Sequence, residues 1–367
     1  MCVYAKDCDV AIEHLRANRV AILSGPADQP WARGWQRFGT RTATGSSSCR
    51  DCDAAACVTA EERLHAVLIE PQLARFRELC GVGGVALTAS FDGWHRHAIM
   101  APDRVYLFPR HSSDVSALLR EAAFLEALDG RGVPAPRLLG RWRDPTVSPY
   151  PFIAVSRCRG RTWHQLETAA TLDTVATMLE SLGGAIASWH GLDRHQLPRR
   201  FRRRHDDIDD MLDADELWAA AAAAARVLGL PRRQAADWCR ELEPLTAMEP
   251  VLVHGDVNEG QIVVDDTLAV TCILDWERAH VGHPLKDFDF GEWGHGIFAW
   301  EPHFGVLRRR MWEAYVAVRG GTLPSWRAMH LAFCLAWAYG YSRGTRLNDW
   351  ARARLANNLE LLRQLTG

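Results

Sequence analysis

The stretch 251-VLVHGDVNEGQIVVDD-266 places a polar segment between two short apolar runs, VLV and IVV. Each run has the length and composition of a short buried strand. The segment between them carries His254, Asp256 and Gln261. Buried polar groups cost free energy unless they are bonded, and functional groups are often carried by loops on a rigid scaffold. We therefore interpret this stretch as a functional loop between two strands.

A second stretch, 272-CILDWERAHVGHPLKDFDFGEW-293, repeats the pattern, because an apolar strand again ends in an acid, Asp275. Two such strand ends bring their acids together if the strands pair as neighbours. Neighbouring carboxylates repel each other unless a cation lies between them or they share a proton. Mg²⁺ prefers oxygen ligands and commonly accompanies nucleotide phosphates, so the two stretches predict a magnesium-nucleotide site.

Length and composition indicate a soluble globular protein with room for two lobes. The chain has 367 residues, of which 48% are hydrophobic and 24% charged. The formal net charge of -2 argues against a general binder of nucleic acid or of anionic membranes. The sequence has no apolar run near the roughly 18 residues that span a bilayer, and MCVYAKDCDV at the N-terminus does not resemble a secretory signal. These features predict a cytoplasmic location.

The ten cysteines are expected to be thiols in that compartment. The cluster CRDCDAAAC, residues 49–57, resembles the beginning of a zinc site. No second Cys or His pair at zinc-finger spacing follows it, so incidental cysteines are the preferred interpretation.

Patterns along the chain divide it into three parts. Residues 1–57 show little periodicity and are predicted to be a poorly ordered extension. Residues 58–157 contain short strand-like runs and one helical pattern, and are predicted to form a β-rich, nucleotide-binding N-lobe. Residues 158–367 are mainly helical apart from the two quoted stretches, and are predicted to form the catalytic and acceptor-binding C-lobe.

In kinases, an H-x-D loop delivers an Asp to the acceptor hydroxyl, while an amide five residues later and a separate Asp hold the metals. The segments HGDVNEGQ, ILDWE and GHPLKDFDF match this order, and on them the chain resembles the aminoglycoside phosphotransferase family. Residues 133–142 and 152–163 are similar to hygromycin-type phosphotransferases, and residues 94–110 to viomycin and capreomycin phosphotransferases. The resemblance covers about residues 60–350.

This resemblance implies an α+β fold that is bilobal and protein-kinase-like, with a small β-rich N-lobe and a larger, mainly helical C-lobe. It implies that Asp256 positions and deprotonates the acceptor hydroxyl and that Asp275 binds Mg²⁺. Gln261 stands where the family has Asn, and its carbonyl oxygen is still a competent metal ligand.

The resemblance also implies a nucleotide site in the N-lobe. Glu121 falls where the family's helix pairs a carboxylate with a phosphate-binding cation, and Ile153 and Val155 belong to the segment expected to read adenine through backbone groups. The family's Lys or Arg on the third strand aligns near Leu107, and the nearest cation is Arg110. Residues 107 and 110 point to opposite faces of a strand, so Arg110 fits only if Pro109 bends the chain or the register shifts.

The implied reaction transfers the γ-phosphate of ATP, or of GTP, to a hydroxyl of a small molecule, with an aminoglycoside or another antibiotic as the candidate acceptor. Seven acids within residues 206–216 are consistent with an acidic wall for a cationic acceptor, or with a solvated helix start. Two alternatives are left open. One is a nucleotide-binding pseudo-kinase that serves as a regulatory module, and the other is a kinase of a sugar or amino-alcohol metabolite. Nucleic acid and membrane partners are not expected, and the oligomeric state is left open.

Three further residues have supporting roles in this interpretation. His254 is expected to brace the loop through backbone hydrogen bonds. Asp287 is expected to cap the following helix or to orient the metal loop. The turn at Gly93 is a candidate for a phosphate-covering loop, or an ordinary hairpin turn.

Overall fold

The computed structural model describes residues 60–90, 95–198, 201, 214–342 and 349–366, together with the short strands β1 (Cys2–Val3) and β2 (Gln36–Arg37). Four predictions concern residues outside this part of the chain. They are the rest of the N-terminal extension, the cysteines of residues 49–57, the turn at Gly93 and most of the acidic run 206–216.

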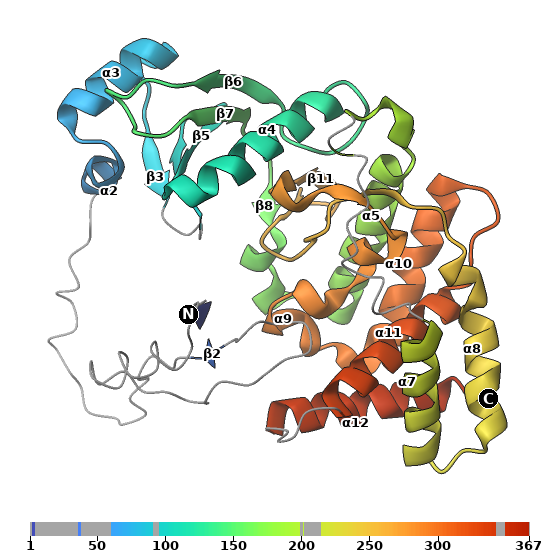
Figure 1. Cartoon of the computed structure of the whole chain (residues 1–367). Coiled ribbons are helices and arrows are strands. Elements are labelled where there is room, and N and C mark those ends of the chain that lie inside the picture. Colours follow the sequence, from blue (N-terminus) through green and yellow to red (C-terminus); the bar gives the residue numbers. More distant parts are fainter. Residues whose placement is uncertain are drawn as a thin grey trace, which may run out of the picture.

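The first part of the described chain forms a five-stranded antiparallel sheet in the order β3-β4-β5-β7-β6 (Figure 1). Its strands are β3 (Thr88–Ser90), β4 (Arg96–Met100), β5 (Arg104–Pro109), β6 (Leu138–Trp142) and β7 (Phe152–Ser156).

Three helices accompany this sheet, namely α2 (Ala60–Val67), α3 (Glu70–Cys80) and α4 (Val115–Leu128). Successive side chains of a strand point to opposite faces, and β7 uses both faces. Phe152 and Ala154 join a core with Phe76 of α3, while Ile153 and Val155 join a larger core that α4 shares with the second half of the chain. The sheet therefore lies between two cores.

The second half of the chain is mainly helical (Figure 1). Its helices are α5 (Leu172–His190), α7 (Ala214–Val227), α8 (Arg232–Thr246), α9 (His295–Phe298), α10 (Phe304–Arg319), α11 (Trp326–Ser342) and α12 (Asp349–Gln364). This arrangement confirms the predicted α+β fold with a β-rich small lobe and a larger helical lobe, while the boundaries assigned to the lobes stay predictions.

Helices α5 and α10 pack backbone against backbone at Gly183. A Cβ atom at this position would lie 2.0 Å from the carbonyl oxygen of Met311. Such an approach is possible only without a side chain, so Gly183 sets the separation of the two helices.

Two small sheets lie within the helical lobe. One pairs β9 (Val251–Val253) with β12 (His280–Gly282), and the other has the order β11-β10-β8. Its strands are β8 (Arg161–Thr162), β10 (Ile262–Val264) and β11 (Val270–Ile273).

The two predicted strands of the opening stretch are confirmed, but the way in which their acids were expected to meet is wrong. The strand that precedes Asp256 is β9, and the strand that precedes Asp275 is β11. These strands belong to different sheets and do not pair as neighbours. The two segments are nevertheless joined by strand pairing, because β10, which follows the loop of Asp256, pairs antiparallel with β11, with Ile262 opposite Ile273.

The prediction that all cysteines are thiols is wrong for one pair. Cys158, just after β7, is joined by a disulfide to Cys272 of β11, with Cα atoms 6.0 Å apart. Burial of Cys272 and this separation, which is within the usual range for disulfides, make the pair compatible with a bond that sequence spacing alone does not reveal. Among the described residues, Cys80, Cys239 and Cys334 are free thiols.

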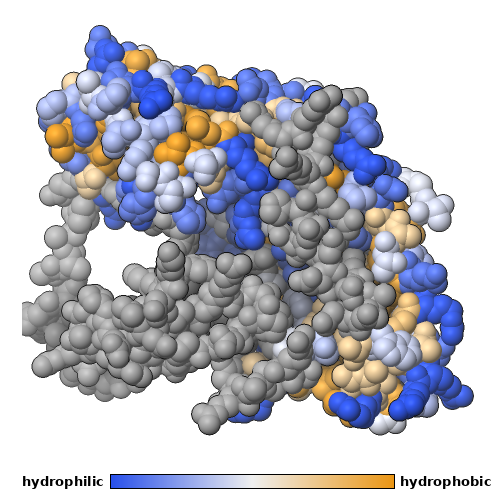
Figure 2. Space-filling model, in the orientation of Figure 1, coloured by the Kyte–Doolittle hydropathy of each residue, from blue (hydrophilic) through white to orange (hydrophobic). Residues whose placement is uncertain are grey.

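In the space-filling view, strongly hydrophilic residues gather at the edge of the β-rich lobe that faces the helical lobe (Figure 2). Within the described ranges, no helix has both the length and the apolar character needed to cross a membrane.

Candidate active site

The loop between β9 and β10 carries Asp256. Gly255 has a φ of 82°, and a Cβ atom there would lie 2.9 Å from the carbonyl oxygen of Arg278, so glycine allows both the turn and the close approach. One carboxylate oxygen of Asp256 accepts a hydrogen bond from Nε2 of Gln261 at 3.2 Å. The other lies 3.5 Å from Nη1 of Arg278. The Asp256 side chain is 20% exposed, so it is held on two sides and still reaches solvent.

Asp287 anchors this loop through hydrogen bonds to its backbone. Its side chain is fully buried and accepts hydrogen bonds from the backbone N–H groups of His254 and Gly255, both at 2.9 Å. It also accepts one from Nε1 of Trp189 at 2.8 Å and contacts Nε2 of His190 at 3.0 Å. Asp287 therefore orients the loop, which confirms the second of its two predicted roles.

Burial alone would raise the pKa of the Asp287 carboxyl. The hydrogen bond from His190, the charges of His190 and His254 and the N–H of Gly255 outweigh burial and lower this pKa to about 2. The carboxylate is therefore ionised near neutral pH, and the donors around it satisfy the buried charge.

His254 joins the two quoted stretches. Its Nε2 lies 2.9 Å from the carbonyl oxygen of Leu274, and the backbone N–H of Leu274 donates to the carbonyl oxygen of Gln261 at 2.9 Å. The predicted bracing role of His254 is confirmed. Because Leu274 immediately precedes Asp275, these contacts place the segments that carry Asp256 and Asp275 against each other.

Asp275 adopts a left-handed backbone conformation, with φ 63° and ψ 66°. Such a conformation is uncommon for residues other than glycine, although Asp tolerates it better than most, and it is frequent at functional sites. It ends β11 and turns the chain into the 3₁₀ turn Trp276–Arg278.

Two buried oxygen atoms at this junction accept no hydrogen bond. They are Oε1 of Gln261 and Oδ1 of Asp275, the second of which lies 3.5 Å from the guanidinium of Arg96. Buried oxygens without a donor are unfavourable, and carboxylate and amide oxygens are suitable ligands for Mg²⁺. The side chains present thus fit a divalent cation at the residues predicted to bind one.

The guanidinium of Arg96, on β4, lies among three carboxylates. Nη1 forms an ion pair with Glu121 of α4, and Nη2 forms one with Glu277 and lies 3.5 Å from Oδ1 of Asp275. The Arg96 side chain is 11% exposed and that of Glu121 only 3%. Glu121 therefore does pair with a cation, and that cation comes from β4.

This cluster has more negative than positive charge. Burial raises the pKa of Glu121 to about 7; the positive charge of Arg96 opposes the shift, and the charges of Asp275 and Glu277 add to it. One guanidinium does not neutralise three carboxylates, and a bound divalent cation would reduce the remaining repulsion.

Arg110 and the adenine-reading residues lie elsewhere in the small lobe. Arg110 follows β5, and its backbone N–H donates to the carbonyl oxygen of His95 at 3.0 Å. Ile153 and Val155 lie on β7, which is paired with β5 on one side and β6 on the other. This pairing is at odds with the prediction that they read adenine through backbone groups, because those groups lie inside the sheet.

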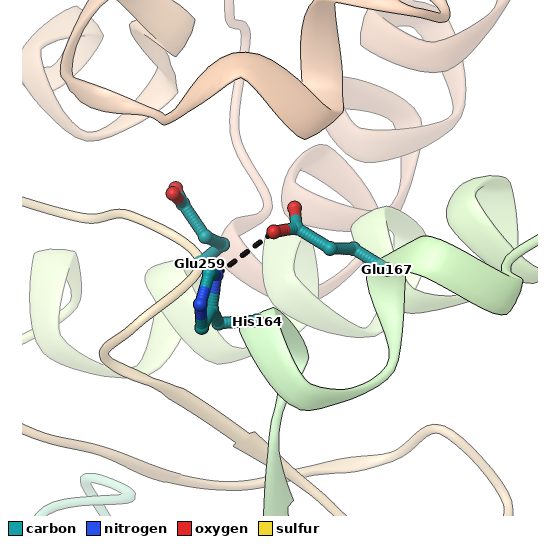
Figure 3. A group of neighbouring side chains, drawn as sticks. All are labelled: His164, Glu167 and Glu259. Atoms are coloured by element: carbon teal, nitrogen blue, oxygen red, sulfur yellow. Dashed lines mark hydrogen bonds and ion pairs between the residues drawn. The ribbon is translucent and has the colours of Figure 1, made fainter. Parts of the chain in front are cut away.

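A third group of side chains that could hold a cation consists of His164, Glu167 and Glu259, whose ligand atoms all lie within 4.8 Å of one another (Figure 3). Nδ1 of His164 lies 2.8 Å from Oε1 of Glu167. Both carboxylate oxygens of Glu259 accept the backbone N–H of Gly294, at 2.8 and 2.9 Å. Burial and the charge of Glu259 raise the pKa of Glu167, so this group also carries excess negative charge.

Sequence reasoning missed Arg96, Glu277 and Arg278. Glu277 and Arg278 follow the ILDW strand end directly, and their nearness to Asp275 along the chain was the available signal. Arg96 lies within a stretch already recognised, residues 94–110, but its importance depends on strand pairing.

Comparison with known proteins places this geometry in context. A family model described as "Phosphotransferase enzyme family" matches residues 87–332, well over half of the chain. The structure of the GDP complex of aminoglycoside 2'-phosphotransferase-IIIa has a TM-score of 0.50 at 16% identity, covering 83% of this chain and 98% of that one.

Two further solved structures are similar at lower scores. Aminoglycoside phosphotransferase APH(3'')-Id from Streptomyces rimosus has a TM-score of 0.46 at 19% identity, covering 80% of this chain and 98% of that one. Macrolide 2'-phosphotransferase MphH from Brachybacterium faecium has a TM-score of 0.45 at 18% identity, with coverage of 80% and 98%.

Proposed function

The chain belongs to the phosphotransferase enzyme family, and from this premise we propose that it transfers the γ-phosphate of a magnesium nucleotide to a hydroxyl of a small molecule. One observation carries the proposal: the loop of Asp256 is bonded to the segment of Asp275, and two buried oxygens there accept no hydrogen bond. Oε1 of Gln261 is one, and Oδ1 of Asp275, which has only an ion-pair contact of 3.5 Å with Arg96, is the other. A base and a cation-binding pair at one place are what phosphoryl transfer requires.

Asp256 is the proposed catalytic residue. The hydrogen bond from Gln261 and the nearby guanidinium of Arg278 fix the orientation of its carboxylate. An acceptor hydroxyl that donates a hydrogen bond to this carboxylate is aligned for reaction and loses its proton to it. Positioning of this kind supplies much of the rate enhancement in phosphoryl transfer.

Asp275 and Gln261 are the proposed metal ligands. These two side chains would hold Mg²⁺, which would supply positive charge against the negative charge that develops on the transferred phosphate. Gln261 keeps its amide N–H on Asp256 while its carbonyl oxygen accepts no hydrogen bond, so one side chain connects the base with the metal position.

The nucleotide base is proposed to contact the segment that leaves β7, residues 157–160, rather than Ile153 and Val155. Within this segment the chain departs from the five-stranded sheet and reaches β8. ATP is the proposed phosphate donor, and GTP is a second candidate because a relative was solved with GDP.

The acceptor is proposed to be an aminoglycoside or another cationic antibiotic. Glu259 follows Asp256 by three residues in the same loop, and with Glu167 it forms a negatively charged group. A protonated amine of the acceptor would be attracted to these carboxylates while its hydroxyl meets Asp256.

A panel of acceptors tests the proposal. Purified protein is incubated with MgATP or MgGTP and with aminoglycosides, cyclic peptide antibiotics, macrolides, sugars and amino alcohols, and phosphorylated products are identified by mass spectrometry. At least one hydroxyl-bearing acceptor is expected to be phosphorylated, and Asp256→Asn is expected to abolish the product.

Two outcomes would point to the alternatives. Turnover of only sugars or amino alcohols would indicate a metabolite kinase. A large thermal shift with MgATP but no product with any acceptor would favour a regulatory nucleotide-binding protein and contradict the proposed activity.

A further inference from the structure

Arg96 is the cation that the structure brings to Glu121. It is carried by β4, whereas the resemblance to the family implies a phosphate-binding cation near Leu107 of β5. Its side chain is 11% exposed and meets carboxylates from both lobes, namely Glu121 on one side and Asp275 and Glu277 on the other. Burying a cation costs free energy of desolvation, which an ion pair on the surface avoids. The burial of Arg96 at this junction therefore needs a functional explanation.

The register of the sheet explains how Arg96 can replace a cation at position 107. Leu107 is paired directly with Ala98, and residues opposite each other in adjacent strands point to the same face. Alternate residues of a strand share a face, so Arg96 and Ala98 lie on the same side as Leu107. Relative to position 107, position 96 thus lies one strand away, about 4.8 Å, and two residues along the strand, about 7 Å. Both positions lie on the same face of the sheet.

The chemistry of arginine suits this displaced position. Its side chain is long, and its planar guanidinium presents several donors in a fixed fork. One arm, Nη1, is engaged by Glu121, while the other, Nη2, faces the metal-ligand carboxylate of Asp275 and Glu277. The first arm holds the side chain in place, and the second is directed to the segment proposed to bind the magnesium nucleotide.

We propose that Arg96, delivered by β4, binds the phosphates of the nucleotide and replaces the cation that the family carries on β5. This inference rests on the proposed function. Glu277 and Asp275 contact Nη2 in the structure; on nucleotide binding, phosphate oxygens replace them while Glu121 keeps Nη1. Arginine is well matched to such bidentate recognition of phosphate.

Affinities for a nucleotide and for its nucleoside test this role, because only the nucleotide carries phosphates. Binding of MgATP and of adenosine is measured by calorimetry for wild type and Arg96→Gln, with GTP and guanosine substituted if wild type prefers them. Arg96→Gln is expected to weaken ATP binding about 10- to 100-fold, as for loss of a charge-assisted hydrogen bond, and to change adenosine binding less than twofold.

A restored cation sharpens the test. The double variant Arg96→Gln with Leu107→Lys returns a cation to the family position and is expected to recover at least part of the lost ATP affinity. Arg104→Gln is the matched control, since it removes one positive charge from β5 at a site where Arg104 pairs with the exposed Asp103. That control is expected to leave both affinities unchanged.

The outcomes separate this inference from the proposed function. If wild type binds neither ATP nor GTP, the proposed function fails. If wild type binds ATP more tightly than adenosine and Arg96→Gln binds both equally well as wild type, the inference on Arg96 alone is overturned. The same holds if Arg110→Gln, rather than Arg96→Gln, causes the selective loss.

Circular dichroism and thermal melting establish that each variant is folded. Should Arg96→Gln fail to fold, Arg96→Lys decides the question, because it keeps a positive charge among the three carboxylates. A selective loss of ATP affinity of several-fold or more supports the role of the guanidinium, and unchanged ATP affinity contradicts it.

Discussion

The polar loop of the helical lobe and the sheet of the small lobe supply charged groups to the same place in different ways. The loop carries its groups within eight residues, from His254 to Gln261. The small lobe joins Arg96 on β4 to Glu121 on α4, 25 residues apart, and the meeting depends on strand register. Chemistry encoded in a continuous motif can therefore be recognised in the sequence, whereas chemistry assembled from separate elements depends on the fold.

The first prediction concerns the loop side of this comparison. If Asp256 supplies the base, Asp256→Ala lowers turnover by about 10²- to 10⁴-fold and leaves nucleotide affinity unchanged. Steady-state kinetics and calorimetry measure the two quantities. Asp266→Asn is the control, because Asp266 is an exposed residue ten positions along the same stretch. Turnover by Asp256→Ala at the wild-type rate would contradict the proposed role.

The second prediction tests whether Asp275 is a ligand of the metal. Asp275→Asn is expected to lower turnover by roughly 10²- to 10³-fold, because it weakens the hold on Mg²⁺. Nucleotide affinity measured with Mg²⁺ and with a chelator should differ in wild type and become nearly equal in the variant. A variant that keeps the full magnesium dependence would remove Asp275 from the metal site.

The third prediction concerns the covalent link between the two regions. The Cys158–Cys272 disulfide closes a loop with a sequence separation of 114, which is long enough for a substantial effect on the unfolded chain. Reduction is expected to cost about 2–4 kcal/mol of unfolding free energy. Thermal melts with and without reductant should differ for wild type and coincide for Cys158→Ser. Identical wild-type melts would show that the bond does not form.

The fourth prediction concerns the support beneath the loop. Hydrogen bonds lower the pKa of Asp287 from 3.8 to about 2, so on acidification the unfolded chain takes up the proton first. The stability that this carboxylate contributes, about 2 kcal/mol, is present above pH about 4 and is lost as pH falls to about 2. An NMR titration of the Asp287 carboxyl carbon should show a midpoint near 2, and a midpoint near 4 would contradict the prediction.

Much of the helical lobe could be predicted from the sequence. The strand-like runs VLV and IVV form strands, His254 braces the loop, and Asp287 orients it. These features depend on short apolar runs and on residues near one another in a motif, so local patterns were sufficient.

The remaining features depend on which strands become neighbours. Strand β9 pairs with β12 rather than β11, and β7 lies inside the sheet, which encloses the backbone groups of Ile153 and Val155. The pairing of β4 with β5 brings Arg96 to the face where Leu107 stands. No periodicity along the chain specifies these neighbours, because strand order and register are set by tertiary packing.

The close packing of α5 and α10 at Gly183 is linked to the loop that carries the proposed catalytic residue. His190 lies seven residues further along α5, about two helical turns, and connects Tyr315 of α10 with Asp287. A single methyl group at position 183 would push α10 away from α5. This shift would disturb the contacts from Tyr315 through His190 to Asp287, which accepts a hydrogen bond from the backbone of the Asp256 loop. In a random mutagenesis screen for inactive enzyme, Gly183→Ala should therefore appear among the hits, although alanine is ordinarily the mildest replacement in a helix.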